Sequence, residues 1–167
     1  MDIRNYAGYA FDYIVSFSAF EHIIELDKVL DAMKNNLKSK GRIYVGFGPL
    51  WNSPFGDHRR TKTIIPWGHL LFSESLLITK LNLFREKKIN SIYDLGLNKL
   101  SLSDYRRMFR NSGLQVKNFK INVSDNFISK IFSVIRKIPF LEEYFTHNIY
   151  CIWENRSKKA VEILNEI

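Results

Sequence analysis

Apolar and polar positions along the chain change their spacing from strand-like to helix-like and back. Residues 11–17 are an uninterrupted run of mostly aromatic and β-branched residues, which predicts a buried strand. From Leu26 the apolar positions recur on one helical stripe, with charged and amide residues opposite. Residues 42–47 predict a second strand. Because strand, helix and strand follow with short connections, we expect a βαβ unit with parallel strands.

The end of that helix and the region beyond the second strand carry turn signals. Gly41 is predicted to cap the helix in the left-handed conformation, just after two lysines that favour the negative end of the helix dipole. Prolines and glycines then interrupt residues 49–100, which we interpret as an insertion above the sheet. Within it, residues 69–85 are rich in leucine and predict one helix.

Regular spacing returns at Ser101, where Ser101 and Asp104 are spaced as in a capping box. A helix is expected to follow and to end at Gly113. The remaining pattern predicts elements in this order: a strand at 114–123, a basic amphipathic helix at 127–138, a strand at 146–154 and a helical tail to residue 167. We expect residues 1–167 to form a single domain.

Composition excludes several classes of protein. With 46% hydrophobic and 25% charged residues, the chain is not expected to be disordered. Cys151 is the single cysteine, so an internal disulfide is excluded and a small buried residue is expected. No apolar stretch has the length of a membrane span, and the N-terminus does not have the pattern of a signal peptide. These features predict a cytoplasmic protein.

The net charge of +8 is concentrated in the middle of the chain. Residues 49–140 carry 16 basic and 6 acidic side chains, a net of +10. This excess suits an anionic substrate, a membrane surface or nucleic acid, but also an ordinary solvated surface. The basic residues are dispersed and no base-reading motif is present, which argues against nucleic acid. The segments 69–85 and 127–138 either pack on the sheet or face an anionic membrane or a lipid-like substrate.

The stretch from Phe11-Asp12 through an apolar strand to Glu21-His22, with Gly41 and another strand after it, resembles class I S-adenosylmethionine (SAM)-dependent methyltransferases of type 11. Residues 48–58, 65–67 and 96–99 also resemble a subgroup of these enzymes. The resemblance implies an α/β fold: a partial Rossmann-like sheet with strand order 4-5-7-6 and the last strand antiparallel, helices on both faces and an inserted lid.

The resemblance covers the C-terminal part of such an enzyme. The Gly-rich loop that holds SAM in the family has no counterpart, because Gly46-Phe47-Gly48 follows a later strand. We therefore expect a truncated domain with weak or no activity alone, from an enzyme acting on a small molecule that is anionic or lipid-like. The alternative is a non-catalytic remnant or accessory domain that pairs with another chain, or with itself, through an exposed strand edge.

The resemblance also implies roles for individual residues. Asp2 is the candidate for the adenine end of the cofactor, and Ser16, Phe17 and Ser18 lie where the sulfonium is expected. His22 either acts as a general base or, with Glu21, anchors the loop. From the insertion, His58, Arg59 and Arg60 are candidates for substrate binding. No metal site is expected, because the spacing of Asp57, His58 and His69 fits no ligand motif.

Overall fold

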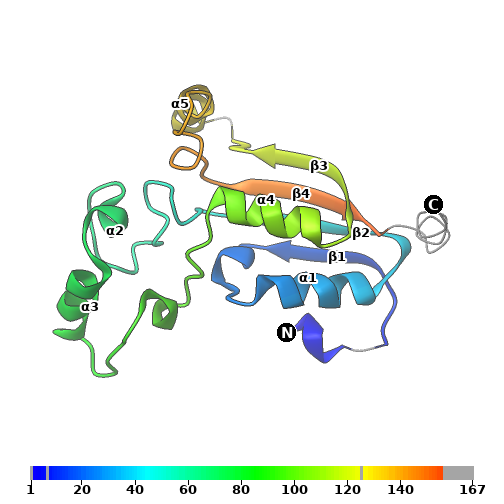
Figure 1. Cartoon of the computed structure of the whole chain (residues 1–167), viewed down its shortest axis with the longest axis horizontal. Helices are drawn as coiled ribbons and strands as arrows, with labels where there is room; N and C mark the ends of the chain where they lie inside the picture. Colours follow the sequence, from blue (N-terminus) through cyan, green and yellow to red (C-terminus); the bar gives the residue numbers. More distant parts are fainter. Residues whose placement is uncertain (1, 7, 125, 156–167) are drawn as a thin grey trace.

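The computed structural model describes residues 2–6, 8–124 and 126–155, and its centre is a four-stranded sheet (Figure 1). The spatial order is β1-β2-β4-β3. The strands are β1 (Phe11–Phe17), β2 (Leu37–Phe47), β3 (Gln115–Ile121) and β4 (Ile149–Glu154). Strands β1 and β2 are parallel, and β4 runs antiparallel to both of its neighbours. The expected strand order and orientations are therefore confirmed.

The helices follow the predicted order. They are α1 (Leu26–Asn35), α2 (Gly68–Leu71), α3 (Glu74–Asn82), α4 (Leu102–Asn111) and α5 (Phe127–Ile135), with the 3-10 turns η1 (Ile3–Asn5), η2 (Phe20–His22) and η3 (Ile92–Leu95). The capping box of α4 is confirmed: the Ser101 hydroxyl accepts the N–H of Asp104 at 3.0 Å, and the Asp104 carboxylate accepts the N–H of Ser101 at 3.1 Å. Gly113 follows α4 at φ +71°, as expected for a helix end.

The predicted cap at Gly41 is wrong. Helix α1 ends earlier, and Lys40, not Gly41, takes the left-handed conformation at φ 64°. Gly41 already belongs to β2, and a Cβ there would lie 2.8 Å from Cγ of Leu37. The strand pairing jumps between Phe11–Leu37 and Tyr13–Arg42, so the intervening residues of β2 bulge. The glycine is needed for a close side-chain contact, and the turn is made by its neighbour.

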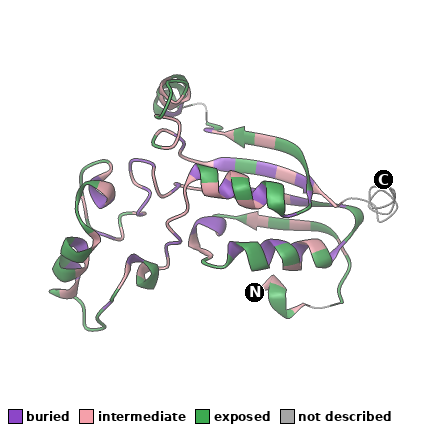
Figure 2. Cartoon of the chain, viewed as in Figure 1, coloured by how far each residue is buried: buried purple, intermediate pink, exposed green. Residues whose placement is uncertain are grey.

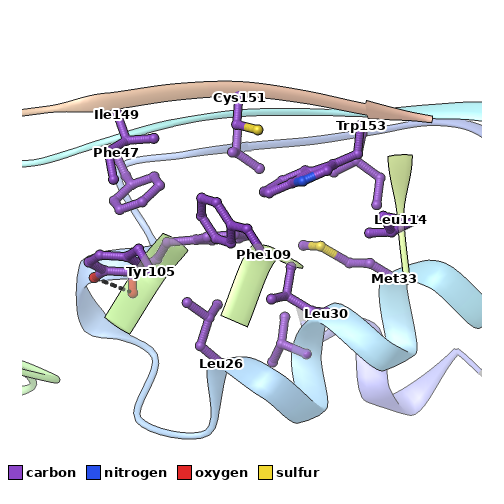
Figure 3. Packing of buried hydrophobic residues seen from close by; sticks show 14 of the residues in the cluster. Leu26, Leu30, Met33, Phe47, Tyr105, Phe109, Leu114, Ile149, Cys151 and Trp153 are labelled. Carbon is purple, nitrogen blue, oxygen red and sulfur yellow. Dashed lines mark hydrogen bonds between the residues drawn. The ribbon is translucent and has the colours of Figure 1, made fainter. Parts of the chain in front are cut away.

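The core lies between the sheet and the two helices α1 and α4, which both cover the same face (Figures 1 and 2). Figure 3 shows Phe109 of α4 packed edge-on against Trp153 of β4, with ring centroids 4.6 Å apart. Cys151 is buried beside them, as predicted, and burial raises the pKa of its thiol to about 12. The helical stripes predicted for α1 and α4 therefore face the core.

The opposite face of the sheet differs from the expectation of helices on both faces. In the part of the chain that the structure describes, no helix covers the β1 side chains on this face: Tyr13, Val15 and Phe17 are 65%, 60% and 62% exposed. The apolar side chains of α5 are mostly exposed as well, so that helix does not bury the sheet. Edge strand β1 and this open face are apolar surfaces without cover among the described residues.

The insertion also differs in detail from the prediction of one helix at 69–85. Two helices, α2 and α3, are separated at Phe72 and Ser73, and the Ser73 hydroxyl caps α3 by accepting the N–H of Leu76 at 3.3 Å. None of the described helices combines the length and apolar character that crossing a membrane requires. The predicted helical tail lies outside the described residues.

Candidate functional site

The candidate site lies where the parallel strands β1 and β2 end. After β1 the chain turns into η2, which carries Glu21 and His22. After β2 it continues into Gly48 and Pro49, the start of the insertion. Ligands of open α/β sheets bind outside the carboxyl ends of the strands. Both segments therefore lie where such a fold places chemistry.

Glu21 is buried, and one of its carboxylate oxygens is unpaired within the part of the chain that the structure describes. Its side chain is 4% exposed, and Oε1 accepts the backbone N–H of Gly48 at 3.4 Å. Oε2 is buried and has no hydrogen-bond partner among the described residues. Burial raises the pKa of this carboxyl, and the Gly48 N–H offsets only part of the effect. An unpaired buried carboxylate oxygen is costly, so this group points to a missing partner.

His22 and His58 are neighbours in space although 36 positions separate them in the sequence. Their ring centroids lie 4.8 Å apart. Nδ1 of His22 donates to the carbonyl of Gly96 at 2.7 Å, and Nε2 of His58 donates to the carbonyl of Pro49 at 3.2 Å. Because a carbonyl oxygen only accepts, these bonds assign the protonated nitrogens. In the neutral form of each ring, the lone pair is therefore on Nε2 of His22 and on Nδ1 of His58.

Burial is the main reason that the pKa of His58 falls to about 4, and the adjacent His22 lowers it further. His58 is therefore neutral near pH 7. Its backbone is left-handed at φ 52°, a conformation that is uncommon for a residue with a side chain. The local fold thus holds a neutral imidazole beside His22 at a conformational cost.

Arg60 and Asn98 hold this region together. The Arg60 guanidinium donates to the carbonyl of Leu95 and, at 3.2 Å, to that of Gly96, the same oxygen that His22 uses. Buried Asn98 donates to the carbonyl of Phe20 at 2.6 Å and anchors η2. Arg60 is consequently a positioning residue in this structure, and its bonds to carbonyls leave fewer N–H groups for a substrate.

Arg59 lies apart from Arg60. It is exposed, has a left-handed backbone at φ 57°, and its guanidinium lies 5.2 Å from the ring centroid of Phe55. Of the three predicted substrate-binding residues, the structure brings His58 and Arg60 to His22 and places Arg59 on the outer surface of the insertion.

The predicted cofactor residues are spread over different surroundings. The Asp2 carboxylate is held by Arg4 at 2.6 Å, and this bond lowers its pKa to about 2. Ser18 leaves β1 at φ 49° and its N–H donates to Gly46 at 2.8 Å. The Phe17 ring covers Gly46 on the open face, since a Cβ at Gly46 would lie 2.8 Å from it. By strand alternation, Ser16 faces the helix side.

Of the three residues considered as metal ligands from the sequence, Asp57 and His69 lie close together, whereas the side chain of His58 lies with Glu21 and His22. Their closest atoms, Asp57 Oδ1 and His69 Nδ1, are 3.8 Å apart in the interior of the insertion. The other Asp57 oxygen accepts the hydroxyl and, at 3.2 Å, the N–H of Thr61, so this aspartate shapes the loop. His58 instead approaches Glu21 and His22, a contact that was not predicted and for which the adjacent pair Glu21-His22 is the only signal in the sequence.

A separate pocket lies in the insertion. It has a volume of about 360 Å³ and is lined mainly by apolar side chains, together with two lysines: Ile64, Ile65, Phe72, Leu76, Leu77, Lys62 and Lys80. Apolar walls combined with ammonium groups suit a ligand that is apolar with an anionic end.

Comparisons with known proteins agree with the fold. No protein-family model and no curated protein sequence matches the chain. Among solved structures, one described as an S-adenosylmethionine-dependent methyltransferase from Listeria monocytogenes is similar, with a TM-score of 0.50, 11% identity, and coverage of 93% of this chain and 67% of that one. The [4+2]-cyclase SpnF is similar with a TM-score of 0.50 and 12% identity, and the alignment covers 93% of this chain and 54% of the cyclase. A sarcosine dimethylglycine methyltransferase from Galdieria sulphuraria has a TM-score of 0.49 and 15% identity, with coverage of 93% and 58%.

Identities this low establish the fold alone. The chain has part of the class I methyltransferase fold, as its resemblance implied. It spans 58% and 54% of the lengths of the Galdieria protein and the cyclase. Because one neighbour is named as a cyclase, the fold does not by itself define the reaction.

Proposed function

We propose that the chain is the acceptor-side part of a SAM-dependent methyltransferase that acts on a small molecule. The observation that carries this proposal is the position of His22: it follows the first of two parallel strands in a class I methyltransferase fold, and its Nδ1 is engaged by Gly96, which makes Nε2 the basic nitrogen of the neutral ring. SAM would supply an electrophilic methyl group. The residues of this chain would orient the acceptor and receive its proton.

His22 is the proposed general base. With SAM bound, Nε2 of His22 would take the proton of the acceptor oxygen or nitrogen as that atom is methylated. The hydrogen bond from Nδ1 to Gly96 holds the ring in the required tautomer and steadies the positive charge that develops on it.

We propose that the described residues serve mainly the methyl end of SAM. Ser16 and Ser18 lie at the end of β1, and we propose that they and Phe17 line the sulfonium site. Asp2 would serve the adenine end only after releasing Arg4, which now occupies its carboxylate. The 167 residues contain no Gly-rich loop after a first strand, so we infer that this chain alone binds SAM weakly.

The insertion is the proposed lid and the source of acceptor specificity. His58 and Arg60 border His22, and the pocket lined by Phe72, Lys62 and Lys80 has apolar walls with positive charge. We propose an acceptor that is small and anionic or lipid-like. Arg59 would contribute only long-range attraction, because it lies outside the cluster.

The test is SAM titration by calorimetry, together with methyl transfer from labelled SAM, on the 167-residue chain and on the full product of its gene. The proposal expects no micromolar SAM binding by the chain alone. In an active full product, His22→Ala should lower methyl transfer by about 100-fold or more with little change in SAM affinity. His147→Ala is the matched control. Equal losses of transfer and affinity would reject His22 as base, and a full product without SAM affinity would reject the function.

A second candidate function is pairing with another polypeptide. The open edge of β1 and the exposed side chains of Tyr13, Val15 and Phe17 favour it, since such edges and faces recruit partners. Light scattering coupled to size-exclusion chromatography tests this proposal for self-association. A monomer that stays monomeric at high concentration would count against it, and Val15→Lys should reduce any association observed.

A further inference from the structure

The strongest unexplained feature of the structure is the convergence of three metal-binding side chains at the ends of β1 and β2. Glu21, His22 and His58 each offer one ligand atom, and these atoms all lie within 4.8 Å of one another. Two ligands come from η2 and the third comes from the insertion, so the cluster forms only when the insertion packs on the strand ends.

The hydrogen bonds around the cluster are those of metal ligands. A histidine that binds a metal ordinarily donates its other ring N–H to a carbonyl or carboxylate. Here both histidines do so, His22 to Gly96 and His58 to Pro49, at 2.7 and 3.2 Å. Each is left with one nitrogen that has a free lone pair.

Glu21 supplies an independent indication. Glu21 is 4% exposed, its Oε1 is held by Gly48, and its Oε2 is buried with no partner in residues 2–6, 8–124 and 126–155. A carboxylate oxygen in this condition is destabilising unless a cation or a donor satisfies it. Two neutral imidazoles provide no such donor on their free nitrogens.

We propose that Glu21, His22 and His58 bind one divalent transition-metal ion. Two imidazoles and one carboxylate form a ligand set that suits zinc, iron, cobalt or nickel rather than magnesium or calcium, which prefer oxygen ligands. Three protein ligands leave open positions for water or for a substrate oxygen.

The geometry requires a modest closure. Ligand atoms about 2.1 Å from a tetrahedral metal lie about 3.4 Å apart. The ligand atoms here are within 4.8 Å, so the side chains must close by up to about 1.4 Å, the difference between the two separations. The side chain of Glu21 and the loop that carries His58 supply this movement without unpairing β1 and β2.

This inference deepens the proposed function and changes one role in it. A metal on Nε2 of His22 would occupy the lone pair that general-base catalysis needs. The metal would then lower the pKa of a coordinated acceptor hydroxyl, and His22 would act as a ligand. Metal binding itself does not depend on SAM, so the two proposals can fail separately.

The test uses the untagged chain, stripped with a chelator and titrated with Co²⁺ alone, followed by calorimetry and by the visible absorption of the bound ion. We expect one ion per chain. Glu21→Gln, His22→Gln and His58→Gln should each weaken Co²⁺ binding at least tenfold. His147→Gln is the control, because it removes a half-buried histidine outside the cluster and should leave affinity unchanged.

The outcomes separate the alternatives. A wild-type affinity weaker than millimolar, or binding that survives all three substitutions, would overturn the metal site. Loss of binding in His69→Gln, with binding retained in His58→Gln, would place the ion at Asp57 and overturn it as well. Circular dichroism checks folding, and His58→Gln decides the matter if Glu21→Gln does not fold. If Co²⁺ does not bind but the full product transfers methyl groups, His22 remains the base.

Discussion

Asn98 is expected to be the most sensitive polar residue outside the ligand cluster. Its side chain is 6% exposed, and Nδ2 donates to the carbonyls of Phe20 at 2.6 Å and Ile23 at 3.1 Å. Its Oδ1 accepts the N–H of Leu100 at 3.1 Å. Asn98 therefore fixes both ends of η2, the turn that presents Glu21.

The expected loss in the free energy of unfolding follows from the groups that Asn98→Ala would leave without a hydrogen-bond partner. A buried acceptor that loses its only donor costs about 1–3 kcal/mol. The carbonyls of Phe20 and Ile23 each lose a donor and the N–H of Leu100 loses its acceptor, but the Tyr105 hydroxyl, 3.4 Å from the Phe20 carbonyl, recovers part of the loss. We expect a net loss of about 3 kcal/mol in the free energy of unfolding, which lowers the midpoint of thermal unfolding by about 6–12 °C for a chain of this size.

The assay is differential scanning calorimetry of the wild type, Asn98→Ala and the control Asn90→Ala. Asn90 is exposed, and its truncation should change the free energy of unfolding by less than about 0.5 kcal/mol. A difference of about 2 °C between the midpoints of Asn98→Ala and Asn90→Ala corresponds to less than about 1 kcal/mol in the free energy of unfolding. If the measured difference were that small, the inferred anchoring of η2 would be incorrect.

Three further predictions concern the core, the loop and one ion pair. Phe109→Ala should cost about 3–5 kcal/mol in urea unfolding, whereas exposed Phe127→Ala should cost little; similar costs would contradict the packing of α4 on the sheet. Gly56→Ala should abolish soluble folded protein, because a Cβ there would collide with backbone carbonyls, and a normal circular dichroism spectrum would disprove this. The Arg106 guanidinium beside Glu142 lowers the pKa of that carboxyl below its ordinary value of 4.5. The ion pair therefore stabilises the fold fully above pH 4.5, and this stabilisation is lost as the pH falls through the lowered pKa of Glu142. Glu142→Gln should therefore destabilise the chain at pH 7, and the effect should shrink as the pH is lowered below 4.5; an effect that does not change with pH would contradict the pairing.

Local patterns predicted most of the fold. The spacing of apolar residues located β1, α1 and β2, and the pair Ser101 and Asp104 marked the start of α4, because these signals depend on residues close in sequence. Gly41 misled the prediction, since a glycine marks either a turn or a close contact and only packing against Leu37 distinguishes them. Which face α1 and α4 would cover depends on connections across the sheet, and the sequence does not display them.

The candidate site was predicted in part. His22 was a candidate because the stretch from Phe11 to His22 resembles a methyltransferase motif, and it lies in the turn that follows β1. The position of His58 beside His22 depends on the path of the irregular insertion, in which apolar residues do not recur at a regular spacing. The roles of Asn98 and of Arg60 as anchors were also hidden, since their partners are backbone carbonyls and no side-chain pattern records them.

The carbonyl oxygen of Gly96 accepts hydrogen bonds from both the imidazole of His22 and the guanidinium of Arg60. The peptide group of Gly96 therefore links the insertion, which carries Arg60, to the turn η2 after β1, which carries His22. Under the proposed function, an acceptor that shifted the outer loops would move this peptide group and, with it, the imidazole of His22. Binding of the acceptor and orientation of the proposed base would then be coupled through a single peptide group.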